Sequence, residues 1–193
     1  MASIVKKYSF DREIFYWIFL SFSFFFLLVE FIVTPVQRAL NLPQTVHASL
    51  LFLPHGIRVL SIWLFQERAV IPLFLVHLVT YTFWPHGGDA LTYIGLVFVG
   101  TLCAPCAFVL VRATGIDISP KNVSVVHWRV ILLVGFFASI INSIGNSFLL
   151  SPTIHPSMHL TTAATYMIGD TMGVLVVLVI LLFLFRFNRL AKN

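Results

Sequence analysis

The stretch AATYMIGDTMGVLVVLVILLFLF, residues 163–185, carries one charged side chain, Asp170, among otherwise mostly apolar residues. A helix that crosses a bilayer needs about 20 mostly apolar residues, so this stretch predicts a transmembrane helix. Five further stretches of the same kind precede it: 14–33, 46–65, 69–84, 90–112 and 128–150. We therefore predict an all-α polytopic membrane bundle of about six transmembrane helices, with residues 1–193 forming a single integral membrane domain.

Composition agrees with this interpretation. The chain of 193 residues is 59% hydrophobic and only 10% charged, and its mean hydropathy is +0.98. About a quarter of the residues in a soluble domain are charged, so the lipid bilayer must be the solvent for most of this chain. Six spans also use almost the whole length, which leaves no room for a soluble catalytic or DNA-binding domain. The basic residues are scattered rather than clustered, so we expect no nucleic-acid partner.

The distribution of lysine and arginine predicts the orientation. All basic residues except Arg38 and Arg58 fall at the termini or in alternate loops, which we assign to one side of the membrane: Lys6, Lys7, Arg12, Arg68, Arg112, Lys121, Arg129, Arg186, Arg189 and Lys192. Cytoplasmic loops carry an excess of such residues. We therefore expect both termini in the cytoplasm, and a multi-pass protein of the bacterial inner membrane.

Three charged residues lie well inside the predicted spans, namely Glu30, Arg58 and Asp170. A charge at membrane depth is expensive and marks a functional site by default. At a rise of about 1.5 Å per residue, Arg58 lies about 18 Å and Asp170 about 10 Å from the outer ends of their helices. A long arginine side chain can cover much of that difference, so we expect Arg58 to pair with Asp170. The alternative is a purely structural ion pair that fixes the helices.

Polar residues also follow one face of the fifth span. Ser139, Asn142, Ser143 and Asn146 are spaced i, i+3, i+4 and i+7, which places them on the same side of a helix. Such a stripe should face the bundle interior, where it either lines a binding pocket or forms interhelical hydrogen bonds. Proline or glycine flanks both His55 and Asp170, so we expect the second and sixth spans to be broken there.

Other chemistries receive little support from the sequence. His55 and His77 sit at similar depths on neighbouring spans, which leaves a b-type haem as a minor alternative, and no other cofactor is expected. Cys103 and Cys106 have a redox spacing, but they lie in an apolar helix, where inert core cysteines are the simpler interpretation. No nucleophile–base arrangement, phosphate-binding loop or metal motif is present in the pattern, so we expect neither an enzyme nor a metal site.

Two motifs resemble a known family. Leu53-Pro54-His55-Gly56-Ile57-Arg58, followed by residues 69–72 (AVIP), is similar to the second-helix signature of the bacterial membrane-associated sensor domain, which precedes histidine kinases and diguanylate cyclases. Residues 169–176 (GDTMGVLV) resemble its late helix. The resemblance implies a sensory role, here in a shortened, stand-alone form that signals through a separate membrane or cytoplasmic protein. It singles out Pro54, Gly56, Arg58, Gly169, Asp170 and Gly173.

The functional prediction is a non-enzymatic membrane module with an outward-facing pocket for a small anionic ligand. We expect the pocket to be built from Glu30, His55, Arg58, Asn142, Asn146 and Asp170. Two alternatives stay open. The six-span pattern is also similar to the substrate-binding components of energy-coupling-factor vitamin transporters, and the polar groups would equally suit an accessory or assembly subunit of a membrane complex.

Overall fold

The computed structural model describes residues 11–42, 49–83, 89–116, 118 and 127–190, and every regular element in them is helical. Five helical segments in this part of the chain are long and apolar enough to cross a membrane: Arg12–Ala39, Leu53–Phe83, Ala90–Ala113, Trp128–Leu149 and Pro156–Leu184. The predicted all-helical fold, with helices long and apolar enough to cross a membrane, is therefore confirmed for the described residues. The count differs from six because the second and third predicted spans form one helical segment.

The first segment contains α2 (Arg12–Leu28), a π-helical turn (Val29–Val33) and α3 (Thr34–Ala39). The sequence predicted an end at residue 33, but the helix continues through Pro35. Proline has no N–H to give to the preceding turn. The wider π-turn lies directly before it, where the Thr34 N–H bonds to the Val29 carbonyl. Glu30 lies in this π-turn.

The second segment is a helical hairpin made of α4 (Leu53–Phe65), a 3-10 turn (Gln66–Ala69) and α5 (Val70–Phe83). Gln66, with φ of 54°, reverses the chain direction. The side chains of Arg58 and His77 meet at 3.0 Å, although 19 residues of continuous helix would separate them by about 28 Å. The chain thus turns back, and the two arms, of 13 and 14 residues, meet through these long side chains rather than by close backbone packing.

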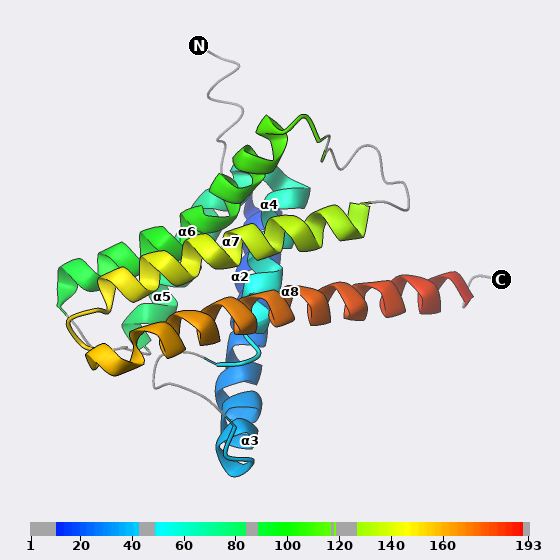
Figure 1. Cartoon of the computed structure of the whole chain (residues 1–193). Coiled ribbons are helices and arrows are strands. Elements are labelled where there is room, and N and C mark those ends of the chain that lie inside the picture. Colours follow the sequence, from blue (N-terminus) through cyan, green and yellow to red (C-terminus); the bar gives the residue numbers. More distant parts are fainter. Residues whose placement is uncertain (1–10, 43–48, 84–88, 117, 119–126, 191–193) are drawn as a thin grey trace.

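Helix α4 occupies the centre of the bundle. It packs against α2, α6 (Ala90–Ala113), α7 (His127–Leu149) and α8 (His159–Leu190). Figure 1 shows α6, α7 and α8 following one another as neighbours, with α2 and α4 crossing behind them. Most of α4 is buried, including the polar residues His55, Arg58 and Ser61. The intramembrane arginine is therefore placed in the core rather than toward lipid.

Two expectations about broken helices are wrong. The second span was predicted to start at residue 46 with a break at Pro54, but residues 49–52 are not helical and Pro54 lies in the first turn of α4. Proline suits this position, because the first turn has no internal acceptor for its N–H. Helix α8 runs without interruption through Gly169 and Gly173. These glycines serve close packing, as described below, and not a break in the helix.

The N-terminus of α6 gives a small, separable test of local stability. Asp89 caps this helix by accepting from the Thr92 N–H at 2.9 Å and the Thr92 hydroxyl at 2.7 Å. These hydrogen bonds lower the pKa of Asp89 below its ordinary value of 3.8. The cap should therefore stabilise the fold above that value and fade as the pH falls through the lowered pKa. We expect Asp89→Ala to lower the melting temperature modestly at neutral pH and hardly at all in strong acid, whereas Asp89→Asn keeps the cap. Equal losses at both pH values would contradict this role.

Candidate functional site: the buried Arg58 cluster

Two glycines of α8 position the start of α4. Phe52 donates its N–H to the Gly169 carbonyl at 2.9 Å, which ties the backbone before α4 directly to α8. A Cβ atom at Gly169 would overlap the Ser49 carbonyl oxygen, and one at Gly173 would overlap that of Phe52. Only glycine permits this approach of two backbones. Because α4 begins here, His55 and Arg58 on its next turns come alongside Asp170 of α8.

Arg58 is the centre of the site and is only 2% exposed. Its Nη1 donates to His55 Nδ1 at 3.0 Å and to Cys103 Sγ at 3.2 Å, and its Nη2 donates to His77 Nε2 at 3.0 Å. Its Nε is buried without a hydrogen-bond partner among the described residues. We call Arg58, His55, His77, Cys103 and Asp170 the Arg58 cluster. The cluster brings together α4, α5, α6 and α8.

The partners of the two imidazoles assign their tautomers. His77 Nδ1 lies 2.6 Å from the Leu73 carbonyl, and His55 Nε2 lies 3.3 Å from the Gly135 carbonyl. A carbonyl oxygen only accepts, so these nitrogens carry the hydrogens. The opposite nitrogens then accept from Arg58, and both rings are neutral. The guanidinium is thus held by neutral acceptors and a thiol.

Asp170 lies at the edge of the cluster and is fully buried. Its Oδ2 accepts from Asn142 Nδ2 at 2.6 Å and lies 3.4 Å from His55 Nδ1. Its Oδ1 has no hydrogen-bond partner among the described residues. The expected direct pair between Arg58 and Asp170 is not formed within the described part of the chain, because His55 stands between the two side chains. The prediction of a direct ion pair is therefore wrong in its geometry.

The predicted polar stripe on α7 does face the bundle interior. Ser139 bonds with the Thr171 hydroxyl at 3.0 Å, and Ser143 donates to the Ala163 carbonyl at 2.6 Å. Asn146 donates to Asn142 Oδ1 at 3.4 Å, and its own Oδ1 is buried and unpartnered among the described residues. The stripe thus extends the Arg58 cluster along α7 toward the loop that joins α7 and α8.

The structure brings five of the six predicted pocket residues together: His55, Arg58, Asn142, Asn146 and Asp170. Glu30 is the exception. It is half-buried in the π-turn of the first segment, and no hydrogen bond or ion pair joins it to the other five in the described part of the chain. Position inside a predicted span correctly indicated that Arg58 and Asp170 belong to one polar site. Depth alone does not show which way a side chain points, and it therefore included Glu30 wrongly.

The geometry does not suit a haem between His55 and His77. Both ring nitrogens of each histidine already face a protein partner, and the Arg58 guanidinium lies between the two rings. Phe22 of α2 covers His77, with ring centroids 4.8 Å apart. A Cβ at Gly100 of α6 would come within 2.7 Å of the His77 ring. The space around His77 is therefore filled by protein, and we do not propose a haem.

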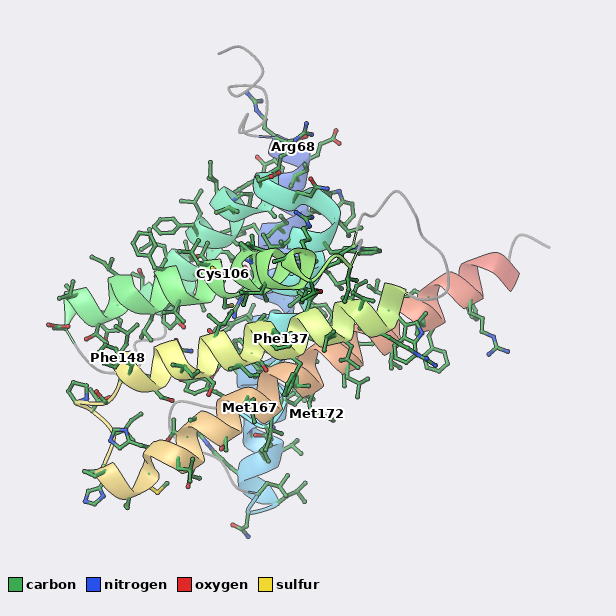
Figure 2. All side chains as sticks on the ribbon, turned by 45° about the horizontal axis from the view of Figure 1, so that its top comes forward. Arg68, Cys106, Phe137, Phe148, Met167 and Met172 are labelled. Atoms are coloured by element: carbon green, nitrogen blue, oxygen red, sulfur yellow. The ribbon has the colours of Figure 1, made fainter. Side chains whose placement is uncertain are left out.

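Sequence reasoning gave Cys103 and His77 no part in the pocket, yet both hold Arg58. The two cysteines of α6 have different environments. Cys103 is buried against Arg58, whereas Cys106 is exposed (Figure 2). The available signal was depth: His55, Arg58 and His77 were all predicted near the middle of neighbouring spans. That signal indicated proximity but not which side chains would bond.

Comparison with known proteins adds no relative to this picture: no family model, no curated protein and no solved structure matches the chain. The Arg58 cluster is therefore the feature that bears on function.

Proposed function

We propose that this protein is a non-enzymatic binding module of the bacterial inner membrane that takes a small anionic ligand at the Arg58 cluster and signals through a separate protein. The observation that carries the proposal is the buried guanidinium of Arg58, which lies at the bundle centre and is held by neutral groups. A desolvated cation without a directly bound carboxylate is stabilised strongly by an incoming anion. The sensory part rests on the resemblance of residues 53–58 and 169–176 to the sensor-domain motifs.

The proposed topology has six crossings, with α4 and α5 as separate short arms and both termini in the cytoplasm. The turn between these arms lies beside the start of α2, where Ile14 and residues 64–68 line a hollow of about 300 Å³. Arg68, which is labelled in Figure 2, thus lies at the same end of the bundle as the start of α2, whose first residue is Arg12. The described basic residues Arg112, Arg129 and Arg186 lie near those ends of α6, α7 and α8 that the alternation assigns to the same side. This distribution supports a cytoplasmic assignment of that side.

Cysteine labelling tests the topology. In a Cys106→Ala background, where the remaining Cys103 is buried, a membrane-impermeant maleimide should label Ser157→Cys in intact spheroplasts. It should label Gln66→Cys and Thr114→Cys only after the membrane is permeabilised. All three positions are exposed, so access to the reagent depends on the side of the membrane. Labelling of Gln66→Cys from outside would contradict the six-crossing arrangement.

Native mass spectrometry tests the binding function. Protein extracted gently from its own membranes should retain a small anionic molecule, and Arg58→Lys should lose at least about nine-tenths of it, because an ammonium point charge cannot reproduce the guanidinium fork. Glu30→Gln is the control, since it alters another charged residue of a predicted span that lies outside the cluster. Equal retention in Arg58→Lys and wild type would overturn the proposal. A chain that carries only another protein would make it an accessory subunit.

A further inference from the structure

His55 Nδ1 lies between a hydrogen-bond donor and a hydrogen-bond acceptor. On one side Arg58 Nη1 approaches at 3.0 Å, and an arginine can only donate. On the other side Asp170 Oδ2 lies at 3.4 Å, and an ionised carboxylate can only accept. One nitrogen cannot accept from the first and donate to the second. A single proton at this position therefore decides which contact forms.

The structure holds the first of two arrangements. The Arg58–His55 distance of 3.0 Å is that of a hydrogen bond, whereas 3.4 Å from His55 to Asp170 is longer than a normal N–H···O bond. In the second arrangement, a proton on His55 Nδ1 bonds the ring to Asp170 Oδ2. Arg58 Nη1 then faces an N–H group, and its bond to His55 is lost. A proton on Asp170 Oδ2 instead keeps His55 as an acceptor.

The surroundings contain no second carboxylate that would compete for this proton within the described residues. The ionisable groups that act on His55 and Asp170 are Arg58 of α4, His77 and Tyr81 of α5, Cys103 of α6 and Tyr166 of α8. From α7 the pair meets only neutral groups, namely Asn142 Nδ2 and the Gly135 carbonyl. Asp170 Oδ1 and Asn146 Oδ1, both buried without a partner among the described residues, extend the polar groups from the pair along α7.

We propose that His55 and Asp170 form one proton-binding site, and that its occupancy controls whether Arg58 takes an anion. A proton on either residue neutralises the pair beside the guanidinium, which then has no net negative neighbour in the pair, and a proton on His55 also breaks its bond to Arg58. The proton comes from water and forms an O–H bond on Asp170 or an N–H bond on His55, and no electrons are transferred. This inference rests on the proposed function for the anion, but the proton site itself does not depend on any ligand. The module would then bind its anion together with a proton.

Infrared difference spectroscopy on the full-length protein in lipid nanodiscs tests the site without a known ligand. We expect a protonated-carboxyl band that titrates reversibly above about pH 5, where exposed carboxylates are already ionised. Asp170→Asn should remove the band, and Asp170→Glu should keep it at a changed frequency. Glu30→Gln, the control for the other carboxylate at membrane depth, should leave it unchanged. His55→Gln should move the midpoint by at least about one pH unit, because the shared acceptor is lost.

Three outcomes would overturn the proton site. They are the absence of a titrating carboxyl band between about pH 5 and about pH 9, loss of the band in Glu30→Gln, and an unchanged midpoint of the titration in His55→Gln. Native mass spectrometry on the same preparations separates the two proposals. A retained anion without a titrating band leaves the binding function and removes the proton site. A titrating band without any retained anion leaves the proton site and removes the binding function. If both hold, lowering the pH should tighten anion binding by up to about tenfold per pH unit, as one-proton linkage requires.

Discussion

Replacing Arg58 with methionine is expected to destabilise the folded protein by about 3–5 kcal/mol, the range for breaking a buried ionic arrangement by removing one member. Methionine keeps much of the side-chain volume, so the loss reflects chemistry more than a cavity. It leaves His55 Nδ1, His77 Nε2 and Cys103 without their donor. It also leaves the buried Asp170 without its nearest cation. Thermal unfolding in detergent micelles measures the change.

The matched test is the double variant Arg58→Met with Asp170→Asn. Removing both charges should recover a large part of the lost stability, because no uncompensated buried charge remains. The single variant Asp170→Asn keeps an acceptor for Asn142 and should be the milder of the two single changes. Strictly additive losses in the double variant would show that Arg58 and Asp170 are not coupled through His55, and the electrostatic account of the cluster would have to be abandoned.

Gly173→Ala is the second change with a large expected effect. The added Cβ would overlap the Phe52 carbonyl oxygen and lie 2.6 Å from the Phe52 carbonyl carbon. Both atoms belong to the backbone, and the Phe52 N–H is itself bonded to Gly169. The start of α4 must therefore move away from α8. We expect a loss of at least about 3 kcal/mol in stability, together with loss of the retained anion, since His55 and Arg58 move with α4.

Gly95→Ala provides the control for this change. Its Cβ would meet Leu149 Cδ2 at 2.8 Å, the far end of a flexible side chain that can rotate aside. We expect a small change in melting temperature and normal anion retention. If Gly173→Ala were tolerated as well as Gly95→Ala, the close contact between α4 and α8 would not be what positions the Arg58 cluster.

Much of the secondary structure followed from the sequence, because each long helix is a continuous apolar run with its own internal hydrogen bonds. The predicted spans 90–112 and 128–150 agree closely with α6 and α7. Errors arose where local signals compete. We predicted that the first helix ends before Pro35, but a π-turn accommodates this proline. We predicted a helix break at Pro54, but this proline lies in the first turn of α4. Residue type shows that a proline disturbs a helix, but its position within the helix decides how.

For the site, sequence reasoning identified most of the residues but not their connections. Asn142 and Asn146 share one face of α7 because their spacing requires it, whereas their contact with Asp170 of α8 is a tertiary one. Their separation from Glu30 depends on the rotation of the first helix within the bundle, which no local pattern fixes. The same applies to Arg58, whose partners His77 and Cys103 come from two other helices.

The sequence by itself determined that the chain forms helices long and apolar enough to cross a membrane, where most of them run and which charges fall inside them. These properties depend on hydropathy, spacing and charge along one dimension. Only the tertiary structure decided that α4 and α5 fold into a hairpin, that His55 stands between Arg58 and Asp170, and that glycines of α8 set the position of α4. Those features arise from contacts between segments far apart in the chain, where a difference of one methyl group changes how closely two backbones approach.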